Sequence, residues 1–339
     1  MRKLLIKIIK KVMPKKLIIL YKSIKEKPQN YPVKVRIEAS TLCQLKCCSF
    51  QKDQEKWAIG KGYLKIKDFE KFILKHPYIR EIELSNFGEI FLNPDLLHII
   101  RCAYDNNIIL TASNGVNFNT VSDEILEALV KYRFQAMTIS IDGASQEVYS
   151  SYRINGNFDT VIENIKKLNF YKQKYDSEFP ELVWQYILME ETEKRDDIIK
   201  AKMMAKELNM KIGFKLTWNS YKPNDVEMLR EETGLKFLTR DELFKGEKRI
   251  YASVCYQLWY APQINYDGKL LGCCSAVCDD FGVNVFKTGL SKALKSKNYV
   301  YAKKMLLGQA DIPKRYKNIP CVNCSKFKKM YKNKIFLVE

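Results

Sequence analysis

Residues 43 to 50 read Cys43-Gln-Leu-Lys-Cys47-Cys48-Ser-Phe50 and follow a short segment, residues 33 to 37, in which apolar and polar residues alternate. This alternation predicts a half-buried β-strand, so we expect the cysteines in the loop that leaves its carboxyl end. Thiols clustered in one loop are typical of ligands for a metal ion or an iron-sulfur cluster. The spacing corresponds to C-x-x-x-C-x-x-C, except that Phe50 stands where the third thiol would be.

Strand and helix signals alternate from residue 33 to residue 217. Apolar and β-branched runs predict strands at 33–37, 79–84, 108–112, 136–141, 182–188 and 212–216. Helical periodicity predicts helices at 66–76, from 94 onward, at 123–131, 160–172 and 196–208. Strands that alternate with helices form parallel β/α units, so we expect an α/β fold, built as an open sheet or a partial (β/α)6 TIM-like barrel. Active sites in such folds lie at the carboxyl ends of the strands.

Polar or glycine-rich segments follow four of these strands. Behind the cysteine loop come Gly88-Glu89, then Ser113-Asn114-Gly115, then Ser140-Ile-Asp142-Gly143. Each segment alone is compatible with an ordinary turn or helix cap. Together they converge on one end of the expected sheet, which indicates a functional site.

The order of these motifs, with Tyr152-Arg153 behind the last of them, resembles the radical S-adenosylmethionine (radical SAM) superfamily over residues 33 to 217. The resemblance implies a 4Fe-4S cluster held by the cysteine loop, here Cys43, Cys47 and Cys48, with S-adenosyl-L-methionine on the remaining iron. It also implies that a reductant such as flavodoxin or ferredoxin drives formation of a deoxyadenosyl radical, which abstracts hydrogen from a substrate.

The resemblance further implies a binding site for S-adenosyl-L-methionine. Gly88 and Glu89 match the motif that contacts the methionyl amine, although Ile90 stands where a proline usually follows. An arginine suits a carboxylate because the guanidinium group binds both oxygens. The positions near the ribose, sulfonium or carboxylate are matched by Ser113, Asn114, Ser140, Asp142 and Arg153.

Phe50 cannot ligate iron, and three interpretations of the loop stay open. In the first, Cys48 replaces the missing ligand, although adjacent residues normally point apart. In the second, two protein thiols and an outside ligand hold a labile cluster. In the third, the barrel has lost radical chemistry and is a non-catalytic binding protein.

A second group of cysteines lies behind the barrel region: Cys255, Cys273, Cys321 and Cys324. Between the first two, Asp267-Gly268 predicts a hairpin turn. The spacing resembles a SPASM-type extension, which implies an auxiliary 4Fe-4S cluster on these four thiols. Four thiolates also bind zinc, so a zinc-stabilised basic protein at membrane or nucleic-acid surfaces stays an alternative. Cys274 and Cys278 are spare thiols that either pack or replace a ligand.

Charge is concentrated at the start of this chain, whose formal net charge is +19. Residues 1 to 27 contain ten Lys or Arg and one acidic residue, on an amphipathic pattern too short in its apolar runs to span a bilayer. Such a helix suits either peripheral contact with the anionic inner face of a membrane or packing on the barrel with its basic face in water. No nucleic-acid-binding motif is recognisable, and we expect no nucleic-acid partner. Clustered cysteines in a chain of this length indicate the reducing cytoplasm.

These patterns divide the 339 residues into four parts: a basic amphipathic arm (1–30), a radical SAM-like partial barrel (31–220), a linker or helical segment (221–250), and a small SPASM-like iron-sulfur domain with a β-hairpin (251–339). We therefore expect an oxidoreductase that acts on a peptide, a protein or a small molecule. The sequence does not select among these substrates.

Overall fold

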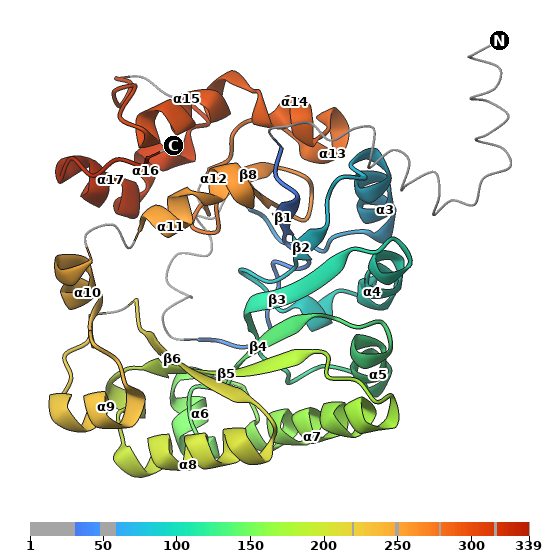
Figure 1. Cartoon of the computed structure of the whole chain (residues 1–339), viewed down its shortest axis with the longest axis vertical. Coiled ribbons are helices and arrows are strands. Elements are labelled where there is room, and N and C mark those ends of the chain that lie inside the picture. Colours follow the sequence, from blue (N-terminus) through green and yellow to red (C-terminus); the bar gives the residue numbers. More distant parts are fainter. Residues whose placement is uncertain are drawn as a thin grey trace, which may run out of the picture.

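The computed structural model describes residues 31–47, 59–218, 220–247, 251–277, 279–314 and 317–338 (Figure 1). The basic arm, Cys48, Phe50 and Cys278 lie outside the described residues. Among the helices within these ranges, none has the length and apolar content needed to cross a membrane. Membrane contact by the arm stays a prediction.

The described residues form one open sheet with the strand order β6-β5-β4-β3-β2-β1-β7-β8. Neighbouring strands from β6 to β7 are parallel, and β8 runs antiparallel to β7. This confirms the expected partial TIM-like barrel. The strands are β1 (Lys34–Ile37), β2 (Glu81–Glu83), β3 (Ile109–Val116), β4 (Ala136–Ser140), β5 (Glu181–Leu188), β6 (Lys211–Leu216), β7 (Gln263–Ile264) and β8 (Leu270–Gly272).

Helices follow the barrel strands and cover the outer side of the sheet, as α3, α4, α5 and α7 show in Figure 1. The barrel helices are α3 (Ile66–Lys75), α4 (Leu96–Asp105), α5 (Asp123–Lys131), α6 (Gln146–Tyr152), α7 (Phe158–Lys174) and α8 (Arg195–Glu207). Those behind the barrel are α9 (Val226–Thr233), α10 (Arg240–Gly246), α11 (Ala252–Cys255), α12 (Gln257–Tyr260), α13 (Val285–Thr288), α14 (Leu290–Leu294), α15 (Lys297–Leu306), α16 (Pro320–Asn323) and α17 (Ser325–Lys332).

Residues along the barrel strands alternate between an apolar face and a polar face. Apolar residues such as Val35 and Ile139 are fully buried in the main core. The polar residues between them bond across strands, as where Arg36 Nε donates to Gln263 Oε1 at 3.0 Å. Parallel strands covered by helices on both faces are apolar throughout. The polar face therefore indicates a side of the sheet that is kept for binding or chemistry.

The segment behind the barrel continues the same sheet. The expected hairpin forms as β7 and β8, and β7 pairs with β1 through Arg36 and Gln263. The imidazole of His76 fixes α14 as well, because its Nε2 accepts from the N–H of Leu290 at 3.1 Å. Both parts share one hydrophobic core cluster. The boundary near residue 251 stays a prediction, and the sheet runs across it.

One turn expected from the sequence is wrong. Ser113, Asn114 and Gly115 lie inside β3 and not behind it, because this strand runs on to Val116. The pairing of β3 with β4 shifts register between Ala112 and Val116. A β-bulge of this kind turns side chains within a continuing strand, so a polar segment with glycine here does not end the strand.

We expect Ile139→Ala to destabilise the fold strongly, because Ile139 is fully buried on β4 between Val116 and Trp184. Removing a buried isoleucine side chain to alanine costs about 2–5 kcal/mol. Urea unfolding followed by tryptophan fluorescence measures the change. The control is Ile109→Ala on β3, where 45% of the side chain is exposed and we expect a loss below about 1 kcal/mol. Equal losses in the two variants would contradict this packing.

Candidate active site and four-cysteine cavity

The cysteine loop leaves β1 and packs tightly against the Gly-Glu turn behind β2. The hydroxyl of Ser40 accepts from the N–H of Leu42 at 3.1 Å, which starts the loop. A Cβ atom on Gly88 would lie 2.2 Å from the carbonyl oxygen of Ser40. Only glycine permits this approach, so the loop and the turn fit together as one unit.

Glu89 lies in this turn with 2% of its surface exposed. Its carboxylate accepts from the N–H of Phe91 at 3.2 Å and from the N–H of Asn117 at 2.5 Å. Burial raises the pKa of Glu89 to about 7. The side-chain amide of Asn117 donates to Cys43 Sγ at 3.6 Å, so one residue connects this carboxylate with the first thiol of the loop. Sequence reasoning missed Asn117, because a lone asparagine just after a strand is typical of a turn.

Asp142 and Arg153 form a buried ion pair that contacts the second thiol. Asp142 is fully buried, and its Oδ1 accepts from the N–H of Ile187 at 2.8 Å. Its Oδ2 accepts from Arg153 Nε at 2.7 Å and also from Nη2. Arg153 Nη1 then donates to Cys47 Sγ at 3.4 Å. The resemblance implied that Arg153 faces a ligand carboxylate, whereas its partners within the described residues include Asp142 and the loop thiol.

A buried glutamate on β2 organises the bulged end of β3. Glu83 Oε2 accepts from the N–H of Ser113 at 3.0 Å. Glu83 Oε1 accepts from the hydroxyl of Ser85 at 2.6 Å, and the Ser85 oxygen accepts from the N–H of Asn114 at 3.1 Å. These bonds use the backbone of the bulge, and the side-chain amide of Asn114 donates to Asn86 Oδ1. An isolated glutamate in a strand gave no sequence signal for this role.

Ser140 belongs to a second row of polar contacts that crosses β4, β5 and β6. Its hydroxyl accepts from Gln185 Nε2 at 3.1 Å, and Gln185 Oε1 accepts from Lys215 Nζ at 2.6 Å. A Cβ atom on Gly115 would lie 2.6 Å from Ser140 Oγ. The structure thus brings the motif residues of four strands to one end of the barrel, beside Cys43 and Cys47.

Glu38 lies directly after β1, is fully buried, and has one unpaired oxygen. Its Oε1 accepts from the N–H groups of Phe87 at 2.9 Å and Gly88 at 3.3 Å. Its Oε2 has no hydrogen-bond partner among the described residues. Burial raises the pKa of Glu38 to about 8, since water no longer stabilises the carboxylate. The Glu38 side chain therefore holds the backbone of the Gly-Glu turn through these two hydrogen bonds.

A separate cavity of about 120 Å³ lies behind the barrel and is lined by all four downstream thiols, Cys255, Cys273, Cys321 and Cys324. Burial raises the pKa of Cys255 to about 12 and raises the pKa values of Cys273 and Cys321 as well. Buried thiols of this kind stay neutral until a cation replaces their protons.

Cys274 has a different role from its neighbour. Its Sγ accepts from Gln257 Nε2 at 3.5 Å and its N–H donates to Gln257 Oε1 at 2.8 Å. It is absent from the lining of the four-cysteine cavity, as far as the described residues show. Across the described ranges, no three His, Cys, Asp or Glu side chains meet closely enough to ligate one ion.

Comparison with solved structures identifies the fold. No family model and no curated protein matches the sequence. SuiB from Streptococcus suis bound to S-adenosylmethionine matches with a TM-score of 0.60 and 16% identity, over 88% of this chain and 72% of SuiB. SuiB bound to its precursor peptide SuiA matches with a TM-score of 0.60 and 14% identity, over 88% and 71%. The protein anSMEcpe with bound AdoMet matches with a TM-score of 0.52 and 12% identity, over 89% and 96%.

SuiB and anSMEcpe are radical SAM proteins. This chain has the radical SAM fold, as the motif resemblance predicted. At identities this low the likeness shows the fold alone, and the chemistry of the chain rests on its own residues.

We expect the stability of Glu38→Gln, relative to the wild type, to increase as pH rises. The folded pKa of Glu38 is about 8, above the ordinary glutamate value of about 4.3. Between these values the native state holds a proton that the unfolded chain has released, so the wild type loses stability as pH rises through this window. Glutamine stays neutral and escapes that loss.

Urea midpoints of both proteins at pH 5.5 and pH 8.5 test this expectation. The urea midpoint of the variant minus that of the wild type should be larger at pH 8.5 than at pH 5.5. A stability difference that is the same at both pH values would contradict a buried, proton-binding Glu38.

Proposed function

We propose that this chain is a radical SAM oxidoreductase that acts on a peptide. The observation that carries the proposal is that both thiols of the described loop are hydrogen-bonded to the barrel, Cys47 to a motif residue and Cys43 to the partner of one. Cys47 Sγ accepts from Arg153, which pairs with Asp142, and Cys43 Sγ accepts from Asn117, which bonds to Glu89. A loop without a ligand has little need for such contacts.

The described residues supply two of the three ligands that the implied group needs. Cys43 and Cys47 would hold a 4Fe-4S cluster together with a third ligand, for which Cys48 is the nearest thiol in the sequence. Donors to cluster sulfurs tune the reduction potential, and Asn117 and Arg153 are such donors. When bound, the cluster and S-adenosyl-L-methionine supply the one-electron cleavage and the hydrogen abstraction.

In this proposal, the side chains of the barrel bind S-adenosyl-L-methionine and orient it. A carboxylate has about four lone-pair sites, and Glu89 uses two of them on backbone N–H groups, which leaves acceptors for the methionyl amine. Arg153 uses three of its five donors on Asp142 and Cys47, which leaves two for a carboxylate. Ser113, Asn114 and Ser140 would contact the ribose side of the ligand.

The four-cysteine cavity supports an auxiliary cluster. Its volume of about 120 Å³ far exceeds the roughly 10–15 Å³ that a single water-sized particle needs. Four cysteine thiolates are the usual ligand set of a 4Fe-4S cluster. We therefore propose Cys255, Cys273, Cys321 and Cys324 as its ligands and assign Cys274 to packing against Gln257.

A peptide substrate is supported by the comparison with SuiB, which has a similar fold and was crystallised with its precursor peptide bound. The barrel end carries polar groups from several strands, which suits an extended ligand with many amide groups. A small flavodoxin or ferredoxin remains the expected electron donor.

A second candidate function is favoured by Phe50 in the sequence. If the loop fails to hold a cluster, the barrel is a non-catalytic relative that binds a ligand through the same residues. Iron counting separates the two candidates.

We expect the anaerobically reconstituted wild type to hold about eight irons per chain and to release deoxyadenosine under dithionite, since two 4Fe-4S clusters are proposed. Cys321→Ser should retain about four irons. Cys43→Ser should also lose about four, together with deoxyadenosine release. Cys102→Ser, on α4 with its sulfur bonded to Asn106, is the matched control and should keep all iron.

About four irons in the wild type, lost in Cys321→Ser but not in Cys43→Ser, would contradict the enzyme proposal. If the protein contains zinc and no labile sulfide, the four cysteines form a structural zinc site and not an auxiliary cluster. Phe50→Cys distinguishes the second candidate. If only this variant gains the first cluster and releases deoxyadenosine, the natural chain is a non-catalytic relative.

A further inference from the structure

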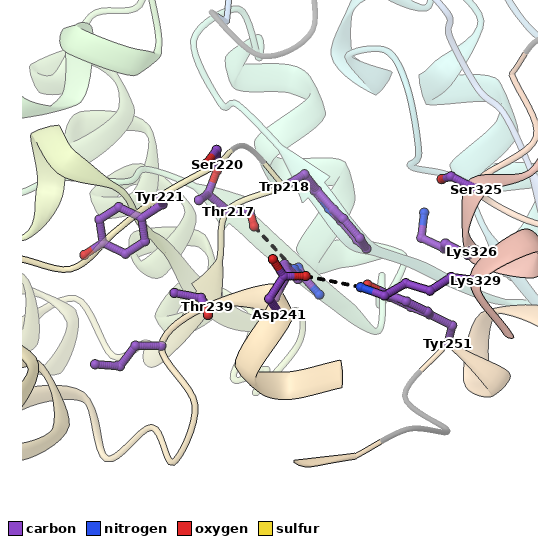
Figure 2. Close-up of a pocket in the computed structure, with 12 residues that line it drawn as sticks. Thr217, Trp218, Ser220, Tyr221, Thr239, Asp241, Tyr251, Ser325, Lys326 and Lys329 are labelled. Atoms are coloured by element: carbon purple, nitrogen blue, oxygen red, sulfur yellow. Dashed lines mark hydrogen bonds and ion pairs between the residues drawn. The ribbon is translucent and has the colours of Figure 1, made fainter. Parts of the chain in front are cut away.

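A pocket of about 390 Å³ lies at the carboxyl end of β6, outside the residues assigned above (Figure 2). Four segments of the sequence form it: the residues after β6, the start of α10, Tyr251 just before α11, and α17. Its lining consists of Thr217, Trp218, Ser220, Tyr221, Leu238, Thr239, Arg240, Asp241, Tyr251, Ser325, Lys326 and Lys329. This volume is within the range of sites that bind small ligands or short peptide segments.

Trp218 is the centre of the pocket, and cations lie against its ring. The guanidinium carbon of Arg240 is 3.8 Å from the ring centroid, and Lys326 Nζ is 4.3 Å from it. Arg240 is fixed by bonds from Nη2 to the carbonyl of Leu216 at 2.8 Å and from Nε to that of Thr217 at 3.4 Å. The indole is nevertheless 60% exposed. A rigid, accessible aromatic ring between cations is a typical anchor for a ligand.

The pocket carries more positive than negative charge. Its lining contains three cations and one carboxylate, Asp241. Asp241 pairs with Lys329 at 3.2 Å, as the dashed line in Figure 2 shows. Lys326 Nζ donates to the neutral hydroxyl of Ser275 at 3.0 Å, and the bonds of Arg240 go to backbone carbonyls. Two of the cations thus have neutral hydrogen-bond partners in these contacts, which favours an anionic ligand.

The pocket adjoins the four-cysteine cavity, because Lys326 lines both of them. On its other side, Arg240 donates to the carbonyl of Leu216 on β6. The preceding residue, Lys215, donates to Gln185, which bonds to Ser140 of the barrel site. A ligand in the pocket would lie beside the barrel mouth and beside the auxiliary site.

We propose that this pocket binds an acidic side chain of the peptide substrate, with its carboxylate at the exposed edge of Trp218, where Arg240 and Lys326 flank the ring. The inference rests on the proposed function for the peptide, and it adds the chemistry that selects it. The carboxylate gains two cationic donors. The peptide segment next to this side chain would then lie near the barrel mouth.

Binding of fluorescein-labelled acetyl-tetraglutamate amide to the full chain, measured by anisotropy without S-adenosylmethionine or reductant, tests the proposal. We expect binding that weakens with salt and exceeds that of the tetraglutamine peptide at least about fivefold. Lys326→Gln should weaken binding about fivefold or more, and Lys326→Arg should restore it. Lys332→Gln removes an exposed charge from the same helix and should change binding less than about twofold.

Equal binding of the two peptides, or equal effects of Lys326→Gln and Lys332→Gln, would overturn the proposal. So would competition by inorganic phosphate as strong as that of unlabelled tetraglutamate at matched ionic strength, because the pocket would then accept any anion. Iron content and thermal unfolding midpoints check that each variant folds. The binding assay needs no radical chemistry. A failure to bind the peptide therefore does not contradict deoxyadenosine release, and a failure to release deoxyadenosine does not contradict peptide binding.

Discussion

The buried ion pair of Asp142 and Arg153 is the contact on which the rest of the site depends. It joins the turn behind β4, the backbone of β5 at Ile187, and the thiol of Cys47. The loop backbone is tied to the same segment, since the N–H of Lys46 donates to the carbonyl of Ile154 at 3.0 Å. Removing one partner of such a pair leaves an uncompensated charge, at a cost of about 3–5 kcal/mol. The barrel therefore holds its cysteine loop through a buried ion pair and a backbone hydrogen bond.

The first strand connects the two cysteine groups. The loop with Cys43 leaves β1, while β7, which leads into the hairpin before Cys273, pairs with the same strand. Asn86 of the Gly-Glu turn adds a direct contact, because its side-chain amide donates to the carbonyl of Cys274 at 3.2 Å. The two thiol sites are thus joined by one strand pairing and one partly buried hydrogen bond.

Much of the fold could be predicted from the sequence, because strand and helix periodicity are local signals; α5 begins and ends where the pattern placed it. The bulge that keeps Ser113 inside β3 could not, since it depends on pairing with β4. Motif order brought Glu89, Asp142 and Arg153 together correctly. Their supporting partners, such as Asn117 and Glu38, carry no motif and bond to residues distant in the chain. Tertiary packing alone defines those roles.

The central claim is that the loop of Cys43 and Cys47 holds a cluster that binds S-adenosyl-L-methionine. Its most direct test is electron paramagnetic resonance of the reconstituted, dithionite-reduced Cys255→Ser/Cys321→Ser protein, in which the four-cysteine cavity has lost two of its four thiols and the barrel site has lost none. We expect the signal of one reduced 4Fe-4S cluster, and we expect its line shape to change when S-adenosyl-L-methionine is added. No signal, or a signal that S-adenosyl-L-methionine leaves unchanged, would contradict the claim.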